Sequence, residues 1–172
     1  MNKTRLIFIT VLTLTALTCF AGVRKAPETR MLPGTWHYTT VRIVADAVPD
    51  NAPQLEQHIN ELLKNSSVTA ESCLLTFHED DRHCTFGVNS RSFRLAWKLD
   101  PATCAFSSSV GPFKVKGSLY TAGENLCLLY APQTLLMMMR FICPLSAKRY
   151  IDEIEDFLDA HPDMQLAVEF SK

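Results

Sequence analysis

Short runs in which apolar and polar residues alternate constrain the fold of this chain more than any other feature. Between residues 73 and 130 such runs follow one another, separated by clusters that contain Gly, Pro, Asp or Asn. The clearest run is 93–99, in which Phe, Leu and Trp alternate with Arg94, Ala96 and Lys98. A period of two is typical of a β-strand with one buried face. The region is therefore predicted to be a series of antiparallel strands joined by tight turns.

Strands and helices are also predicted on both sides of this region. Residues 34–44 are rich in β-branched and aromatic residues, and residues 164–171 alternate in polarity, so both segments are predicted strands. The apolar positions of residues 52–65 fall on one helical face. A pair of helices is expected before the last strand, the first over the Met-rich residues 132–143 and the second beginning at Ser146.

The eight predicted strands indicate a mainly β protein. They favour an eight-stranded antiparallel up-and-down barrel, with a helix after the first strand and a helical pair before the last. A sandwich of two sheets is the alternative, because strand number alone does not separate the two folds. Residues 126–130 are apolar at successive positions, so the outer face of this strand should be covered, and the helical pair is the natural cover. The interior of such a barrel is either filled by side chains or holds one small ligand.

The composition excludes several classes of protein. The chain has 172 residues, of which 47% are hydrophobic, a share typical of a folded protein and not of a disordered one. Its length suits one domain. The chain has 17 Lys and Arg residues and 18 Asp and Glu residues, so it lacks the excess of basic residues that is typical of a nucleic-acid-binding protein. We therefore expect no nucleic acid among its partners.

The first 21 residues have the pattern of a secretory signal peptide. Lys3 and Arg5 precede an uncharged apolar stretch, residues 6–20, which is too short to span a bilayer. We predict a signal peptide over residues 1–21, a linker over residues 22–31 and a barrel domain over residues 32–172.

The predicted location is therefore outside the cytoplasm, in the periplasm, at the outer membrane or on the cell surface. Plain secretion is one interpretation of the leader. In the other, Cys19 is the lipidated first residue of a lipoprotein, which would contact the membrane only through this anchor. The residues before it, Ala16, Leu17 and Thr18, resemble a lipobox poorly, so plain secretion is preferred.

Removal of the leader leaves an odd number of cysteines. Exported proteins can form disulfides, but an odd number leaves at least one thiol unpaired or in an intermolecular bond. No CxxC pair is present, so the spacing fits no zinc site. Cys73, Cys84 and Cys104 share the apolar face of their predicted strands, which indicates small buried side chains and not nucleophiles.

The first predicted strand opens with residues 33–38, which read PGTWHY. This opening resembles the Gly-x-Trp signature of lipocalins, in which the Trp closes one end of the barrel beneath a basic residue from the far end of the chain. The resemblance implies that Lys172 stands over Trp36. Over residues 32–171 the order of elements resembles more closely the lipocalin-like secreted domains of unknown function from Gram-negative gut bacteria. The inserted helices depart from the usual lipocalin layout and could cap the mouth or pack against the outer wall.

Aromatic residues on the inward parity and the Met-rich helix supply the candidate ligand-lining residues. They are Trp36, Tyr38, Phe77, Phe86, Phe93, Trp97, Phe106 and Met138. Met side chains adapt to variable shapes, so this helix is either a lid over an apolar ligand or filling for the core. Our hypothesis is an exported protein that binds a small apolar or amphipathic molecule without catalysis. The alternative is a structural or protein-interaction module of the cell envelope with a filled barrel.

No combination of residues indicates catalysis or a cofactor. The densest chemical cluster is residues 78–84, where His78 and His83 face each other across a predicted turn beside three carboxylates. Such a set can hold a metal ion, but turns are polar for conformational reasons, so no metal site is assigned. The acidic residues between 152 and 159 fit the solvated face of a helix. We therefore predict neither an enzyme nor a bound cofactor.

Overall fold

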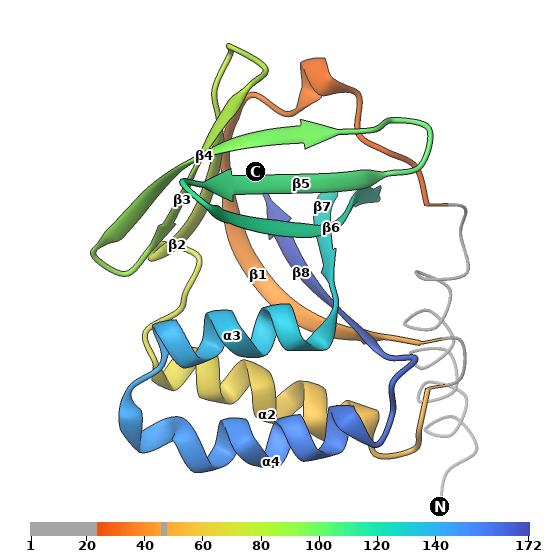
Figure 1. Ribbon diagram of the computed structural model, residues 1–172, viewed down its shortest axis with the longest axis vertical. Helices are drawn as coiled ribbons and strands as arrows, with labels where there is room; N and C mark the ends of the chain where they lie inside the picture. The colour runs from red at the N-terminus through yellow and green to blue at the C-terminus, as the bar shows by residue number, and fades with distance from the viewer. Residues whose placement is uncertain (1–23, 46–47) are drawn as a thin grey trace, which may run out of the picture.

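The computed structural model describes residues 24–45 and 48–172, which form a barrel with helices at one end (Figure 1). The strands are β1 (Gly34–Val44), β2 (Cys73–Phe77), β3 (His83–Val88), β4 (Arg91–Leu99), β5 (Ala105–Val110), β6 (Phe113–Ala122), β7 (Asn125–Tyr130) and β8 (Gln165–Ser171). The α-helices are α2 (Ala52–Asn65), α3 (Pro132–Ile142) and α4 (Lys148–Asp159), with short 3₁₀ turns η1 (Thr29–Met31) and η2 (Leu145–Ala147). The predicted first strand and the predicted helix over residues 52–65 coincide with β1 and α2.

The strands close into a barrel in chain order. Each strand pairs antiparallel with the next, and β1 also pairs with β8, so the sheet has no free edge. The predicted eight-stranded antiparallel barrel is confirmed, and the two-sheet sandwich is excluded. The register follows the alternation: Leu75 pairs with Phe86, and Phe86 pairs with Phe93, which places all three on one face of the sheet.

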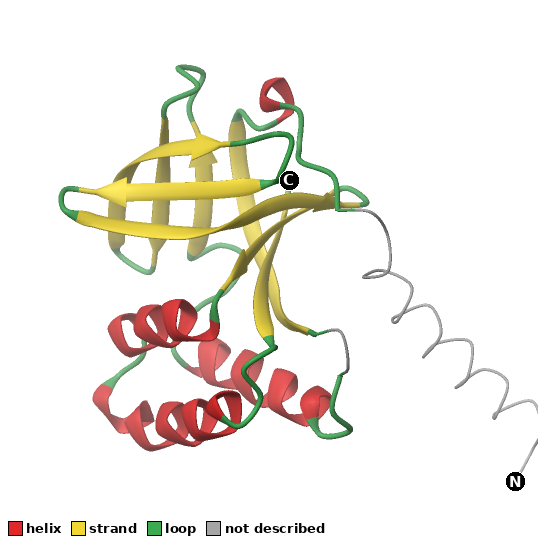
Figure 2. Ribbon diagram, turned by 45° about the vertical axis from the view of Figure 1, so that its right-hand side comes forward, coloured by secondary structure: helices red, strands yellow, loops and turns green. Residues whose placement is uncertain are grey.

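The helices α2, α3 and α4 form a layer across one end of the barrel (Figure 2). Each helix buries one apolar face, as shown by Ile59 of α2, Met139 of α3 and Ile154 of α4, which are at most 2% exposed. The inserted helices therefore cap the mouth of the barrel. Within the described residues, no helix has both the length and the apolar character needed to cross a bilayer.

The outer face of β7 is covered by the segment that precedes β1. Cys127 and Leu129 are buried with Ala26 in a second apolar cluster, outside the barrel. A β-bridge from Lys25 to Thr121 of β6 fixes this segment. The expectation that the helical pair covers this face is wrong, because α3 begins just after β7 ends and continues beyond the rim of the barrel.

Cys104 also belongs to this outer cluster, although the alternation predicts an inward side chain. It directly precedes β5, and its φ of +59° lies in the left-handed region, which breaks the alternation. Its Sγ is 3.8 Å from the carbonyl oxygen of Arg24. Cys73 and Cys84, by contrast, lie in the barrel core. The prediction that these three thiols are buried is confirmed, and the face predicted for Cys104 is wrong.

Candidate functional site

The inward face of the barrel is mainly apolar, with Ser108 of β5 as a buried polar side chain beside Trp97. The buried side chains of the main core include Leu75, Leu128 and Phe170, and none of the described residues in this core is charged. Charged side chains of the same sheet, such as Arg94 and Lys98, occupy the alternating outward positions and are exposed. A molecule inside this barrel would therefore meet no counter-charge.

Three aromatic side chains fill the barrel toward the end opposite the helices. The ring of Trp97 meets the ring of Phe77 edge to face with centroids 5.2 Å apart, and it stacks on Phe106 at 6.3 Å. Each pair of this kind adds about 0.5–1.5 kcal/mol to the free energy of burial. The Nε1 atom of Trp97 is buried and has no hydrogen-bond partner among the described residues. This N–H group can only donate, so an acceptor oxygen would satisfy it.

Four inward-facing apolar side chains remain partly exposed beside α3. They are Phe86 of β3, Phe93 and Leu95 of β4, and Val115 of β6, which we call the inner patch. Helix α3 borders this patch, because the ring centroids of Phe93 and Phe141 lie 5.9 Å apart. The inner patch is therefore apolar surface of the barrel interior that solvent reaches.

Arg91 joins β4 to α3 at the edge of the inner patch. Its Nη1 donates a hydrogen bond to the carbonyl oxygen of Phe141 at 3.2 Å. Its guanidinium carbon lies 4.7 Å from the centre of the Phe141 ring. A cation–π contact at an exposed site contributes about 0.5–1 kcal/mol. The C-terminal end of α3 is thus held to the barrel by modest contacts.

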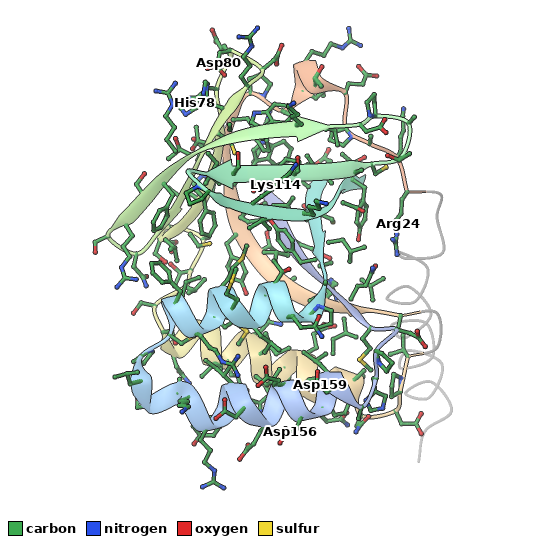
Figure 3. The ribbon with its side chains drawn as sticks, in the orientation of Figure 1. Arg24, His78, Asp80, Lys114, Asp156 and Asp159 are labelled. Carbon is green, nitrogen blue, oxygen red and sulfur yellow. The ribbon has the colours of Figure 1, made fainter. Side chains whose placement is uncertain are left out.

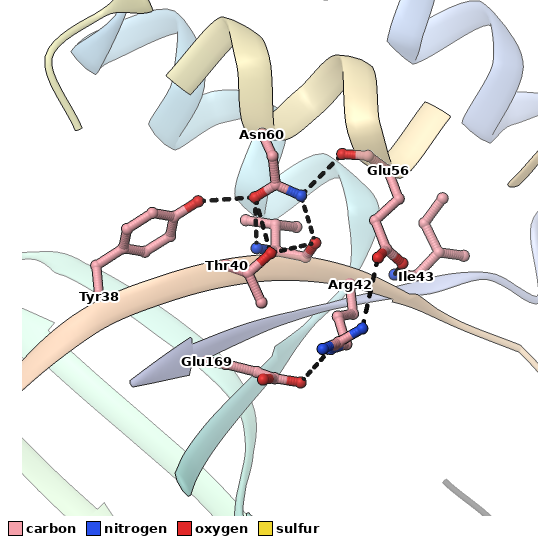
Figure 4. Close-up of polar contacts among 8 residues, drawn as sticks. Tyr38, Thr40, Arg42, Ile43, Glu56, Asn60 and Glu169 are labelled. Carbon is pink, nitrogen blue, oxygen red and sulfur yellow. Dashed lines mark hydrogen bonds and ion pairs between the residues drawn. The ribbon is translucent and has the colours of Figure 1, made fainter. Parts of the chain in front are cut away.

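Asn60 fastens α2 to β1 (Figure 4). Its Oδ1 accepts hydrogen bonds from the Tyr38 hydroxyl at 2.9 Å, the Thr40 hydroxyl at 3.1 Å and the Val41 backbone N–H at 2.8 Å. Its Nδ2 donates to the carbonyl oxygens of Val41 and Glu56, each at 2.8 Å. The β1–β8 register shifts between Tyr38 and Thr40, and Asn60 supplies hydrogen-bond partners beside this irregularity. Burial raises the pKa of Tyr38, so its hydroxyl remains a donor.

Arg42 bridges two carboxylates next to this contact (Figure 4). Its Nε donates to Oε1 of Glu169 at 2.7 Å, and its Nη1 lies 3.7 Å from Oε1 of Glu56. Glu169 is only 6% exposed, and a buried carboxylate needs a paired cation. Glu56 also accepts the backbone N–H of Ile43 at 3.1 Å. These contacts join β1, β8 and α2.

Trp36 closes the end of the barrel opposite the helices. Its Nε1 donates to the carbonyl oxygen of Leu32 at 2.9 Å. The Nζ of Lys172 lies 4.9 Å from the centre of the Trp36 ring and donates to two backbone carbonyl oxygens before β1, at 3.0 and 3.2 Å. Gly34 has a φ of +113°, a backbone conformation that residues with a side chain rarely adopt. This is the arrangement that the Gly-x-Trp signature implies, with Lys172 as the basic residue.

Comparison with known proteins agrees with this geometry. The family described as Lipocalin-like domain (DUF4923) matches residues 15–172. The chain belongs to this lipocalin-like family. No curated protein and no solved structure gives a significant match. The resemblance to a lipocalin-like family of unknown function is therefore confirmed.

The predicted ligand-lining residues of this lipocalin-like domain lie at different depths. The closed end of the barrel is filled by Trp36, Phe77, Trp97 and Phe106. The inner patch contains Phe86 and Phe93. At the helical layer, Tyr38 contacts α2 and Met138 belongs to α3. The sequence-based selection of aromatic residues did not include Leu95 and Val115 of the inner patch, although the alternation of polarity predicts that both face inward. It did not include Asn60 either, which could have been noticed because Asn is unfavourable in the interior of a helix. The candidate lipidation site Cys19 lies outside the described residues.

The histidine-rich tip between β2 and β3 is a turn stabilised by its own side chains (Figure 3). Oδ2 of Asp80 lies 2.6 Å from Nδ1 of His83, and Oδ1 accepts the backbone N–H groups of Arg82 and His83. The contact with His83, followed by these backbone hydrogen bonds, lowers the pKa of Asp80. His78 instead lies with Nε2 2.8 Å from the hydroxyl of Thr85. The described residues contain no group of three His, Cys, Asp or Glu side chains that could hold a metal ion.

The thiols of the barrel are shielded from reaction. Burial raises the pKa of Cys73 and of Cys84 to about 12 and also raises the pKa of Cys143. These groups are therefore protonated at neutral pH, and a protonated thiol is a poor nucleophile. The cysteines in the described part of the chain form no disulfide with one another.

Two surface hollows lie outside the barrel. The first, of about 530 Å³, is lined by residues at the ends of β1 and β8 and at the start of α3, among them Val44, Gln133 and Gln165. The second, of about 280 Å³, lies over β2 and β3 and includes Leu74 and Thr85. Neither hollow includes a residue of the inner patch.

Proposed function

We propose that this protein binds a small apolar or amphipathic molecule inside the barrel, without catalysis, and that the molecule enters at the inner patch. The observation that carries this proposal is the partial exposure of Phe86, Phe93, Leu95 and Val115. Water contact with inward-facing apolar side chains costs about 25 cal/mol for each Å² of surface. A ligand that covers them removes this cost.

The construction of α3 supports entry between this helix and β4. Its neighbouring side chains Met138 and Met139 are unbranched and can follow the shape of a ligand. The contacts of Arg91 and Phe93 with the exposed ring of Phe141 are each worth about 1 kcal/mol, so moving this ring aside needs little free energy.

The uncharged core favours a ligand whose buried part is neutral. A carboxylate carried into this interior would lose its hydration without gaining a cation. The unpartnered Nε1 of Trp97 can donate to a hydroxyl, ketone or ester oxygen. We therefore expect the deeply buried end of the ligand to be neutral, whereas an acidic end, such as that of a fatty acid, would lie at the edge of the inner patch beside Arg91.

The test combines native mass spectrometry with displacement of an apolar fluorescent dye. Val115→Phe places a larger ring at the inner patch, and Lys116→Phe places the same ring on the outward face of the same strand as a matched control. Val115→Phe should weaken dye binding about tenfold or more, because the ring occupies the space of the ligand. Lys116→Phe should bind like the wild type. Equal binding by both variants, or no binding by the wild type, would contradict the proposal.

A protein-interaction module with a filled barrel is the second candidate. The aromatic packing of Trp97 against Phe77 and Phe106 and the position of both hollows outside the barrel favour it. This candidate would be favoured over the first if native mass spectrometry showed no ligand bound to the purified protein and the apolar dye did not bind to it.

We also propose that the chain is exported, to the periplasm, the outer membrane or the cell surface. The pattern of residues 1–21 supports this proposal, and plain secretion is preferred to lipidation at Cys19. Cells expressing the wild type and Cys19→Ala should be labelled with a radioactive fatty acid. Absence of label in both, with an N-terminus at residue 22, is the expected result. If the wild type is labelled and the Cys19→Ala variant is not, the protein is a lipoprotein instead.

A further inference from the structure

Large apolar side chains are exposed at one corner of the helical layer. Of the six exposed large hydrophobic residues in the described part of the chain, four lie between residues 137 and 150. Met137 and Phe141 are four residues apart and share a face of α3. Leu145, at the turn η2 between α3 and α4, is 93% exposed. We call Met137, Phe141 and Leu145 the apolar corner.

The charges around the apolar corner are basic. Residues 131–151 contain Arg140, Lys148 and Arg149 and no Asp or Glu. Arg91 of β4 adds a cation over the ring of Phe141. Arg140 and Arg149 are paired with carboxylates of α4, which leaves Arg91 and Lys148 without a carboxylate partner within the described residues.

The acidic residues of α4 are spread along the helix, and those of its first two turns are paired with Arg140 and Arg149. Asp156 and Asp159 stand near the C-terminal end of α4, whereas η2 precedes its N-terminal end (Figure 3). Near η2 these ion pairs offset the carboxylates, and Arg91 and Lys148 are the cations that keep their charge without an ionic partner among the described residues. An anionic surface would therefore attract this end of the layer.

We propose that the apolar corner docks on the surface of a lipid bilayer that contains anionic headgroups. Leu145, Phe141 and Met137 enter the boundary between headgroups and acyl chains, while Arg91 and Lys148 lie among the headgroups. This inference goes beyond ligand binding and does not require a ligand in the barrel.

The shape of the corner favours a bilayer over a protein partner. Leu145 projects from a turn, and neither surface hollow includes a residue of the apolar corner. A stable protein interface usually buries more than about 1,200 Å² and is shaped to its partner. A fluid bilayer needs no complementary groove, because its acyl chains close around a projecting side chain.

The experiment measures sedimentation of the protein with lipid vesicles. The chain from residue 22 is suitable, since every described strand and helix lies within residues 24–172. Vesicles of phosphatidylglycerol with phosphatidylcholine are compared with vesicles of phosphatidylcholine alone. Leu145→Asp is compared with Met31→Asp, which changes a residue of 60% exposure at the opposite end of the barrel. Lys148→Glu is compared with Lys114→Glu on β6. Circular dichroism verifies that each variant is folded.

The wild type should bind the anionic vesicles more tightly than the neutral ones. Leu145→Asp should weaken binding about tenfold, because the buried leucine is lost, and Lys148→Glu should weaken it about fivefold or more. Met31→Asp and Lys114→Glu should leave binding within about twofold of the wild type. Wild-type protein that does not sediment with anionic vesicles would overturn the proposal. So would equal losses in Leu145→Asp and Met31→Asp, which would place the contact elsewhere.

Discussion

The two sides of the barrel wall differ in what covers them. On β7 and β8, the inward residues Leu126 and Leu166 and the outward residues Cys127 and Ala167 are all completely buried. On β4 and the first half of β6, the outward side chains, such as Arg94 and Lys116, are exposed, and the inward residues of the inner patch are themselves partly exposed. We call the first side the covered wall. This difference in burial depends on which segments pack against each strand, and not on the alternation of polar and apolar residues along it.

The comparison suggests a division of roles. The covered wall carries apolar clusters on both faces, and the Arg42–Glu169 pair links it to β1. The opposite side presents apolar interior surface to solvent next to a helix that is held by Arg91 and Phe93. Stability should therefore depend mainly on the covered wall, and ligand binding on the inner patch.

The largest expected effect tests this division directly. Phe170 of β8 is 1% exposed, so Phe170→Ala should lower the free energy of unfolding by about 3–5 kcal/mol. Phe93→Ala, the same change in the inner patch, should cost about 1–2 kcal/mol, because Phe93 is partly exposed in the folded state. Denaturation in urea measures both. Equal losses would mean that the inner patch is as tightly packed as the covered wall.

The contact between α2 and β1 should give the next largest effect. Asn60→Ala leaves the backbone N–H and C=O groups of Val41 and the hydroxyl of Tyr38 without their partner, which should lower the free energy of unfolding by about 2–4 kcal/mol. Asn65→Ala, at the exposed last position of α2, should change it by less than about 0.5 kcal/mol. If Asn60→Ala lowered the free energy of unfolding as little as Asn65→Ala, water would be replacing the hydrogen bonds of Asn60.

High pH should destabilise the barrel through its buried thiols. The pKa of Cys73 and of Cys84 is about 12 in the folded protein, against an ordinary value of 9.0. Between these values the unfolded chain has lost protons that the native state keeps, so the contribution of these thiols to stability is constant below about pH 9 and falls as the pH rises toward 12. Urea midpoints measured from about pH 8 to pH 11 should decrease, and Cys84→Ala should decrease less steeply. A midpoint that rises over this range would contradict the burial of these groups.

The smallest expected effect concerns the closed end. Lys172→Ala removes the cation over Trp36 and two hydrogen bonds to backbone carbonyl oxygens, and it should cost about 1 kcal/mol. Lys172→Arg keeps the charge and should cost less than half as much. Thermal unfolding followed by tryptophan fluorescence measures both. Identical losses would show that the geometry of the lysine, and not its charge, holds this end.

Most of the fold is predictable from local pattern. The alternation in residues 73–130 indicates its strands, and the turn residues between them mark where hairpins form. The one misplaced side chain among the predicted buried thiols, Cys104, follows a left-handed backbone that no alternation rule includes. The candidate site is predictable only in part, because the exposure of Leu95 and Val115 depends on how far α3 extends over the mouth.

The sequence by itself determined the strands, the helix over residues 52–65, the family signature at Trp36 and the apolar character of the interior. These properties depend on the polarity of residues close together in the chain. Only the tertiary structure decided that the helices cap the mouth, that Ala26 helps to cover β7 and that Asn60 holds α2 to β1. Such contacts join segments far apart in sequence, and they depend on distance and direction in space, which a pattern of polarity does not contain.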